Sequence, residues 1–431
     1  MLKKEVVLTG MGVLSPIGND PVSYWTALCQ GISGISRIWA DENTEGGTPL
    51  LSSLVSDFNV KEILKLRKYQ KNLKVMSRDV QLGFVSAMNA VTDSGLVLDG
   101  DQKSVDPERF GVVFGSDLIG LEIEELLEAF KLGMKDGKHD FSTWGRAAMD
   151  KIFPLWMLKY LPNMIGGHLA IALDARGPNN TLTLRRCSSF AAMIEGIRVI
   201  ERGDADVMLC GGAGNRANPS FLARGKTYEL VPRTSDPDAH PRPYDADRCG
   251  GILGEGAAAF TLERKEFALA RGAKILAEIK GFASVVEPAL YYDENLKRTG
   301  EGVRRVIRLA MSDADRKADD LSHINADGQG TVFEDRLEAQ AIHEELGNVP
   351  VTAPKGAFGD LGSGSGAVEL AASVLGLQQN LIPPTRNHVK TASDCPIDVV
   401  HGVPRESQKS TVLAMNHSRT GRSVALVIEK V

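Results

Sequence analysis

The stretch LTLRRCSSFAAMIEG, residues 182–196, places one cysteine, Cys187, where a strand-like run gives way to a helix-like run. The first turn of a helix has unpaired backbone N–H groups, and these lower the pKa of a thiol placed there. A nucleophile therefore fits this position. The same turn carries Arg186, whose guanidinium is permanently charged and cannot attack a substrate.

Strand-like and helix-like runs alternate on both sides of this stretch. Residues 77–96 predict a helix, and FGVVFG (110–115) and DADVMLCGG (204–212) predict buried strands. Helices at 300–313, 334–346 and 366–379 are separated by the strand patterns INADG and VPVTAP. The similar runs AFTLE (259–263) and ALVIE (425–429) each close a half. We predict two α/β halves, 1–264 and 265–431, with an excursion at about 118–165 that covers one end of the sheet.

Composition excludes several classes of protein. The 431 residues carry a formal net charge of −5 and no long basic run, so nucleic-acid binding is not expected. The five cysteines contain no CxxC pair, which argues against a zinc site or a disulfide framework. We found no apolar run of the roughly 20 residues that span a membrane, no signal peptide and no nucleotide-binding loop. We predict a cytoplasmic protein with no metal, no cofactor and no membrane span.

Eight segments in chain order resemble the β-ketoacyl-acyl-carrier-protein synthases of the thiolase fold. The resemblance implies an α/β fold of five layers, αβαβα, built from two similar halves. It also implies a dimer with residues 175–200 at the interface, and acyl carrier protein as a partner. The segments are VVLTGMGVLSPIGND, GPNNTLTLRRCSS, GDADVMLCGGA, RPYDADRCGGILGEGA, INADGQGTVFEDRLEAQA, APKGAFGDLGSGSGAVE, LIPPT and the C-terminal ending.

The resemblance also implies a reaction, a decarboxylative condensation that uses one cysteine, two histidines and a supporting lysine. Aligned without a gap between residues 177 and 206, the family's cysteine falls on Arg186, and Cys187 comes one place later. The first histidine position is Asp327 in Asn-Ala-Asp-Gly, and the second is Asp360 in the run that begins at Lys355. Only the lysine remains.

These three replacements point to one structural hypothesis. In the family the three side chains converge on one point. A buried guanidinium is costly alone but is satisfied between two carboxylates. We expect Arg186 to bridge Asp327 and Asp360 and to fill the former catalytic cavity. As alternatives, Arg186 reads an anion, or the two aspartates bind a metal or act as acid and base.

The C-terminal ending departs from the family as well. The resemblance implies a Gly/Phe-rich loop after an asparagine, with a phenylalanine that gates the acyl chamber. Here Asn416 and His417 begin that loop, Thr420 takes the gating position, and Gly421 follows. We expect His417 to be a histidine at the loop surface, with a substitute catalytic base as the alternative. Arg419 and Arg422 are candidates for a basic patch that binds the acidic carrier protein.

Three functions follow from the sequence. The first is a catalytically degenerate ketosynthase homologue that acts as a partner or chain-length subunit in fatty acid or polyketide synthesis. The segments ADG, PVTAPK and LIPPT are similar to chain-length factors, which pair with an active ketosynthase. The second is an active synthase that uses Cys187 as an alternative nucleophile, although a buried inert thiol is also open. The third is an acyl-binding protein with a repurposed pocket. A homodimer and a heterodimer with an active ketosynthase are both compatible with the sequence.

Overall fold

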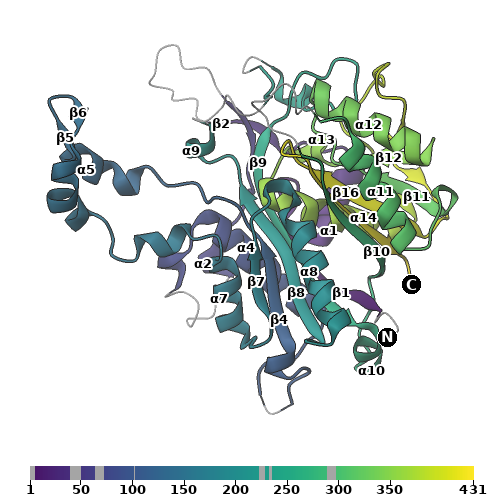
Figure 1. Ribbon diagram of the computed structural model, residues 1–431, viewed down its shortest axis with the longest axis horizontal. Helices are drawn as coiled ribbons and strands as arrows, with labels where there is room; N and C mark the ends of the chain where they lie inside the picture. Colours follow the sequence, from purple (N-terminus) through teal and green to yellow (C-terminus); the bar gives the residue numbers. More distant parts are fainter. Residues whose placement is uncertain are drawn as a thin grey trace.

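The core of the protein is a long run of hydrogen-bonded β-strands (Figure 1). The computed structural model describes residues 5–38, 50–63, 72–100, 102–222, 229–232, 235–288 and 298–431. Within these residues the main sheet has the order β14-β12-β11-β16-β17-β10-β1-β9-β8-β4-β7. The strands of the first half are β1 (Val6–Leu14), β4 (Phe110–Gly115), β7 (Asn179–Leu182), β8 (Val207–Asn215) and β9 (Leu253–Arg264). Those of the second are β10 (Ala277–Val286), β11 (Leu321–Asn325), β12 (Pro350–Thr352), β16 (Thr411–His417) and β17 (Arg422–Glu429).

The two halves of the sheet pair their strands in the same way. In the first half, β9 is antiparallel to both β1 and β8, and β4 is parallel to both β8 and β7. In the second half, β17 is antiparallel to both β10 and β16, and β11 is parallel to both β16 and β12. The runs AFTLE and ALVIE lie in β9 and β17, which take equivalent places. The predicted similarity of the halves is therefore present in the pairing itself.

Helices form three layers around the two half-sheets. In the middle layer α8 (Ser188–Arg202) packs on β8 and β4, while α14 (Ser365–Gln379) packs on β9, on β16 and on α8. The outer layer of the first half contains α4 (Arg78–Asp93) and α7 (Met164–Leu173), and that of the second half contains α11 (Glu301–Asp313) and α12 (Val332–Leu346). Small and apolar residues make up most of α14, and nearly all of them are buried, as expected for a helix covered on all sides. These are the five layers that the resemblance implies.

Shorter elements connect or flank these layers. They are α1 (Pro21–Cys29), β2 (Ile35–Ile38), β3 (Leu50–Ser53), α2 (Val60–Ile63), η1 (Asn72–Val75), η2 (Pro107–Arg109), α5 (Glu124–Leu132), β5 (Met134–Lys135), β6 (Lys138–His139), α6 (Phe141–Thr143), η3 (Trp144–Ala148), η4 (Met149–Lys151), η5 (Trp156–Tyr160), η6 (Arg185–Cys187), α9 (Pro219–Leu222), η8 (Pro237–Ala239), α10 (Lys265–Ala270), η10 (Ala318–Asp320), α13 (Lys355–Phe358), η11 (Gly362–Gly364), β13 (Leu381–Ile382), β14 (Asp398–Val399) and β15 (Arg405–Glu406). Among the described helices, none is both long and apolar enough to cross a bilayer.

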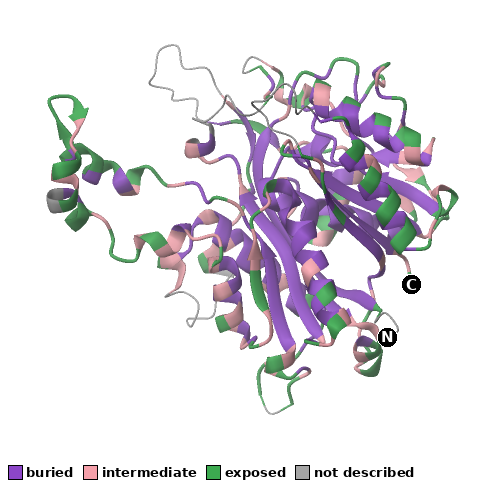
Figure 2. Ribbon diagram, in the orientation of Figure 1, coloured by how far each residue is buried: buried purple, intermediate pink, exposed green. Residues whose placement is uncertain are grey.

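One segment lies elsewhere than the sequence predicts. Most of residues 118–160, which we call the arm, project away from the body of the molecule instead of covering one end of the sheet (Figure 1), while Ile119 and Tyr160 at its two ends are buried in the core of the first half. The aromatic residues at the tip of the arm pack on one another. The rings of Phe130 and Trp144 lie 5.0 Å apart, and those of His139 and Phe141 lie 4.6 Å apart. Figure 2 shows a largely exposed arm beside the buried strands.

Candidate functional site

Arg186 lies in the turn between β7 and α8. Its neighbour Arg185 has a φ of +57°, a left-handed conformation that is unusual for a residue with a side chain. Arg186 follows in η6, and α8 begins two residues later at Ser188. The Arg186 side chain is only 10% exposed. A short strained turn thus places this guanidinium in the interior, next to the second half of the chain.

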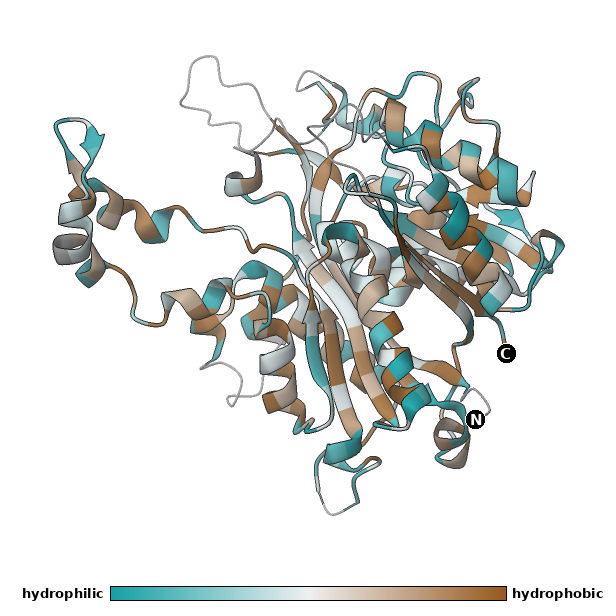
Figure 3. Ribbon diagram, viewed as in Figure 1, coloured by the Kyte–Doolittle hydropathy of each residue, from teal (hydrophilic) through white to brown (hydrophobic). Residues whose placement is uncertain are grey.

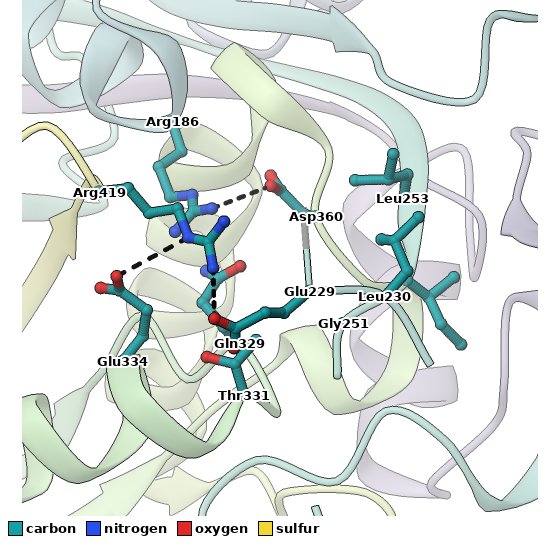
Figure 4. A pocket seen from close by; sticks show the side chains of 11 residues that line it. Arg186, Glu229, Leu230, Gly251, Leu253, Gln329, Thr331, Glu334, Asp360 and Arg419 are labelled. Carbon is teal, nitrogen blue, oxygen red and sulfur yellow. Dashed lines mark hydrogen bonds and ion pairs between the residues drawn. The ribbon is translucent and has the colours of Figure 1, made fainter. Parts of the chain in front are cut away.

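The guanidinium of Arg186 bridges two carboxylates, as the sequence predicts. Its Nη1 lies 3.3 Å from Asp327 Oδ2. Its Nη2 lies 3.3 Å from Asp360 Oδ2, the contact drawn in Figure 4. Nη1 also lies 3.5 Å from the carbonyl oxygen of His417. Burial disfavours the charge on Arg186, but Asp360 and Asp327 outweigh this effect and raise the pKa of the guanidinium. The guanidinium is therefore held in its charged form.

Asp327 is the centre of the cluster. It follows β11 and is fully buried. Its Oδ1 accepts hydrogen bonds from Lys355 Nζ at 2.9 Å and from Asn416 Nδ2 at 3.0 Å. Its Oδ2 accepts one from Gln329 Nε2 at 2.7 Å in addition to that from Arg186. Burial opposes ionisation, yet Lys355 and Arg186 hold the pKa of Asp327 well below its usual range.

Asp360 is held by a turn that requires glycine. Gly359 has a φ of +73°, and a Cβ atom there would lie 2.4 Å from the carbonyl oxygen of Ile252. Asp360 Oδ1 accepts the backbone N–H of Gly362 at 2.9 Å. Burial alone would raise the pKa of Asp360. The charges of Arg186 and Arg216 lower it by more, so this carboxyl is also ionised.

Lys355 joins the cluster to a carboxylate that the sequence analysis missed. Its Nζ forms an ion pair with Glu369 on α14 as well as with Asp327. Asn416 Nδ2 donates to Glu369 Oε2 at 2.7 Å, so Asn416 links the same two carboxylates. Burial raises the pKa of Glu369 to about 7, although Lys355 opposes the rise. In the sequence, Glu369 could have been noticed as the one acidic residue in a run of small and apolar residues from 362 to 370.

His417 corrects one of our expectations. It is the last residue of β16 and is 0% exposed, so it does not lie on a surface loop. Its Nδ1 lies 3.2 Å from Glu334 Oε2, and its Nε2 lies 3.5 Å from Glu338 Oε2. Burial disfavours the charged form, but Glu338 and Asp327 raise the pKa of His417 to about 9. An imidazole that is protonated at neutral pH has no free lone pair with which to act as a base.

Glu334 and Glu338 are further residues that the sequence analysis did not assign to the site. They lie on α12 four positions apart, the spacing that puts two side chains on one face of a helix. Arg298 forms an ion pair with Glu334. Glu338 accepts the backbone N–H of Asp327 at 2.8 Å and the hydroxyl of Tyr244 at 2.6 Å. The i, i+4 pair of acids was the sequence signal that could have revealed them.

The remaining residues of the predicted gate form a tight hairpin between β16 and β17. Thr420 is exposed at its tip, and Gly421 has a φ of +84°. Arg419 donates to Glu229 Oε1 at 2.6 Å, and its Nε lies 3.9 Å from Glu334 Oε1. Arg419 is therefore already paired with acidic residues, which weakens the expectation that it offers a free positive charge to a carrier protein.

The cavity beside Arg186 is almost filled. Its volume is about 20 Å³, room for about one water molecule. Among the described residues, it is lined by Arg186, Glu229, Leu230, Gly251, Ile252, Leu253, Gln329, Thr331, Glu334, Asp360 and Arg419 (Figure 4). A chamber of this size has no space for an acyl chain.

Cys187 points away from this cavity into the core. Its Sγ lies 3.8 Å from the carbonyl oxygen of Asn416 and 3.7 Å from that of Arg422, so the thiol is placed to donate to backbone carbonyls. Burial and the charge of Asp327 raise the pKa of Cys187 to about 12, and the opposing effect of Arg186 is weaker. The helix start alone would lower this pKa. Complete burial of the sulfur raises the pKa instead.

Within the described parts of the chain, no group of three or more His, Cys, Asp or Glu side chains is arranged to hold a metal ion.

The fold and the site can now be compared with known proteins. The family model described as "Beta-ketoacyl synthase, N-terminal domain" matches residues 3–268, and "Beta-ketoacyl synthase, C-terminal domain" matches residues 276–389. The chain belongs to the β-ketoacyl synthase family, and its fold is thiolase-like.

Individual relatives match nearly the whole chain. This chain is 30% identical over 433 residues to the 3-oxoacyl-[acyl-carrier-protein] synthase 2 of Synechocystis sp., with 99% of this chain and 98% of the relative covered. A β-ketoacyl synthase from Burkholderia phymatum STM815 matches with a TM-score of 0.86 and 26% identity, over 99% of this chain and 100% of that one. The ishigamide ketosynthase/chain length factor matches with a TM-score of 0.82 and 28% identity, over 100% of both chains.

Proposed function

We propose that this chain is a non-catalytic ketosynthase homologue that pairs with an active ketosynthase, as a partner or chain-length subunit, in fatty acid or polyketide synthesis. The observation that carries the proposal is the position of Arg186. In our alignment Arg186, Asp327 and Asp360 stand in place of the nucleophile and the two histidines. The guanidinium lies 3.3 Å from each carboxylate.

Each requirement of the condensation is unmet by these side chains. A thioester carbonyl must be attacked by a thiolate, and the developing enolate oxygen must meet neutral or positive hydrogen-bond donors. Asp327 and Asp360 are ionised acceptors that would repel an enolate. Lys355, the family's remaining lysine, is occupied by Asp327 and Glu369. The cationic groups Arg186 and Lys355 are therefore already paired with carboxylates and are not free to stabilise a negatively charged intermediate.

The two alternatives have less support. An active synthase that uses Cys187 needs an accessible thiolate, but this sulfur is fully buried and its pKa is raised to about 12. An acyl-binding protein needs a chamber, and the cavity measures about 20 Å³.

The proposed partner is a second chain of the same fold, and the complex would receive its substrate on acyl carrier protein. The ishigamide ketosynthase/chain length factor is among the structures similar to this chain. A relative of this chain from Synechocystis sp. is named 3-oxoacyl-[acyl-carrier-protein] synthase 2. β7 is the last strand in the described order of the sheet and exposes Asn179 and Asn180. It lies within residues 175–200, which we propose as the interface.

Intact-mass measurement after incubation with acyl-carrier protein tests the catalytic part of this proposal. We expect no acyl adduct on this chain, while an intact ketosynthase treated in parallel gains one. Cys249 is exposed, so the C249S variant serves to exclude adventitious labelling there. An adduct that survives in C249S and is lost in C187S would establish Cys187 as a nucleophile and overturn the proposal.

A further inference from the structure

Cys249 differs from the other four cysteines in its exposure to solvent. All five lie in the described parts of the chain, and Cys249 alone is exposed. Figure 3 shows apolar residues along the strands of the central sheet, and Cys187, Cys210 and Cys395 are buried in clusters of such residues. Cys29 is half-buried, and burial raises the pKa of its thiol to about 11. Cys249 is therefore the thiol that a reagent in solution can reach.

An imidazole lies beside this thiol. Cys249 Sγ lies 3.7 Å from His240 Nδ1, which is within hydrogen-bond distance for sulfur. In the tautomer that carries its proton on Nε2, the imidazole accepts a hydrogen bond from the thiol at Nδ1. A nucleophilic side chain in contact with a base is the arrangement that activates a thiol.

The backbone holds Cys249 in place from both sides. Its neighbour Arg248 is buried, and Nη2 of that arginine donates to Asp394 Oδ1 at 2.8 Å. On the other side, the backbone N–H of Gly250 donates to the carbonyl oxygen of Gly330 at 2.9 Å. The sulfur therefore occupies a position that the fold determines.

The charges around the pair favour a neutral imidazole. Burial and the charge of Arg242 lower the pKa of His240, and the weaker effects of Asp236 and Asp245 oppose them. His240 therefore has a free lone pair at neutral pH. Burial raises the pKa of Cys249, while Arg242 opposes the rise, so the resting form is the thiol. The thiolate forms when the proton passes from Sγ to Nδ1, because the resulting imidazolium stabilises the negative charge.

We propose that Cys249 and His240 form a thiol–disulfide exchange site, which takes low-molecular-weight disulfides and leaves this chain reversibly S-thiolated. The proton of the thiol passes to Nδ1, and the thiolate attacks one sulfur of the disulfide. A bond forms between Sγ and that sulfur, and the disulfide bond breaks. The second sulfur leaves as a thiolate and takes the proton from the imidazolium. The disulfide is the oxidant, and excess thiol reverses the reaction.

Disulfides fit this site better than thioesters do. Attack on a thioester places negative charge on a carbonyl oxygen, which needs hydrogen-bond donors aimed at it in a site that excludes water. Exchange with a disulfide moves charge from sulfur to sulfur, and it needs an accessible thiolate and a route for the proton. The exposed pair of Cys249 and His240 supplies both. This role does not depend on the function proposed above.

The rate of modification by 2-hydroxyethyl disulfide tests the site. The full chain, C249S and H240Q are each incubated with the reagent, quenched in acid and analysed by intact mass. We expect one adduct, which is absent from C249S. At pH 6.5 the unaltered chain should react about tenfold faster than H240Q, because an imidazolium beside a thiolate lowers the pKa of the thiol by about one unit or more. The advantage should fall below about twofold at pH 8.5, where solvent takes the proton and the imidazolium no longer forms.

H343Q, at an exposed histidine of α12, is the matched control and should react like the unaltered chain. Equal rates for H240Q and the unaltered chain at pH 6.5 would make Cys249 an ordinary surface thiol and overturn the site. An adduct that remains in C249S would place the reactive thiol at another cysteine, with the same consequence. If H240Q does not fold, the unaltered chain alone decides the question. A free thiol reacts about tenfold faster for each pH unit, whereas the proposed pair should gain less than about threefold between pH 6.5 and pH 7.5.

Discussion

Arg186, which we propose stands at the family's nucleophile position, is a member of a buried ion-pair network. Replacing a whole buried ion-pair network by apolar residues is often tolerated, but removal of one member leaves its partners charged and unpaired. Asp327 keeps Lys355, Asn416 and Gln329 after the loss of Arg186, whereas Asp360 keeps backbone and hydroxyl donors and the more distant Arg216. Asp360 is therefore the more dependent of the two carboxylates.

The R186M variant is expected to lower the free energy of unfolding by about 3 to 5 kcal/mol, because it leaves buried carboxylates without their shared cation. Urea denaturation measures the loss. The double variant R186M/D360N removes the charge that R186M strands, and we expect it to recover part of the loss. Equal stability of R186M and the unaltered chain would mean that the bridge contributes nothing to the fold.

His417 makes the free energy of unfolding decrease as the pH becomes alkaline. Its pKa rises from the usual 6.5 to about 9 in the folded chain. The stabilisation is thus complete below pH 6.5 and is lost as the pH rises through 9, by about 3 kcal/mol at most. The difference in free energy of unfolding between the unaltered chain and H417Q should shrink between pH 6.5 and pH 9.5. H343Q, at an exposed histidine of α12, is the control and should keep the slope of the unaltered chain.

Sequence could predict the bridge but not its surroundings. Three charged residues at positions that converge in a known fold were enough to place Arg186 between Asp327 and Asp360. The burial of His417 could not be read in this way, because it depends on β16 continuing two residues beyond the expected start of the loop. For Cys187 the sequence left a nucleophile and a buried inert thiol open, since local sequence reveals a helix start but not the depth at which that start is buried; the buried position agrees with the inert thiol.

Among the connecting elements, the segment from Tyr244 to Arg248 joins the two halves through one carboxylate. Asp245 is buried, and its Oδ2 accepts the backbone N–H groups of Val389 at 2.7 Å and Lys390 at 2.9 Å. Its Oδ1 accepts that of Asp247 at 2.9 Å. These bonds attach the segment before β9 to the loop after β13.

The D245A variant should therefore cost about 1 to 3 kcal/mol, because it leaves the backbone N–H groups of Asp247, Val389 and Lys390 without their acceptor. D247A is the matched control. The side chain of Asp247 is 82% exposed and reaches Arg242 only at 3.6 Å, and such a surface pair contributes at most about 1 kcal/mol. Thermal or urea unfolding of both variants measures the difference. Similar losses in the two variants would contradict a structural role for the buried carboxylate.

At the level of elements, the alternation of strands and helices was predictable and the course of the arm was not. The helices predicted at 300–313, 334–346 and 366–379 are observed as α11, α12 and α14 with shifts of one or two residues. Their patterns reflect burial against a sheet, which sequence records directly. The arm has apolar residues too, but no periodicity indicates whether they face the chain's own sheet or another molecule.

For the molecule as a whole, the two halves repeat one pairing scheme, and we propose 1–264 and 265–431 as the units of that repeat. β7 and β12 hold equivalent places, each parallel to the strand beside it. β12 pairs further with β14, whereas β7 ends the described order on its side. Among the described strands, none pairs with the outer edge of β7.

An active ketosynthase that binds at this edge should stabilise the chain by mass action, by about 2.7 kcal/mol when it is present at 100 times its Kd. Hydrogen exchange resolves the location. We expect backbone N–H groups of residues 179–182 to become protected in the complex, while those of exposed α10, which lies away from β7, exchange as before. Stabilisation without protection at β7 would place the interface on another face and contradict the assignment of residues 175–200.

The interlocked charges around Arg186 also constrain the protein's evolutionary history. A change of Arg186 alone to cysteine would leave two buried carboxylates facing a would-be thiolate. A change of either aspartate alone to histidine would leave the arginine short of a partner. On the proposed function, every single substitution toward a condensing enzyme would thus pass through a destabilised intermediate. Once Arg186, Asp327 and Asp360 coexist, the loss of stability disfavours changing any one of them alone. We therefore expect related sequences that carry all three residues to retain them together.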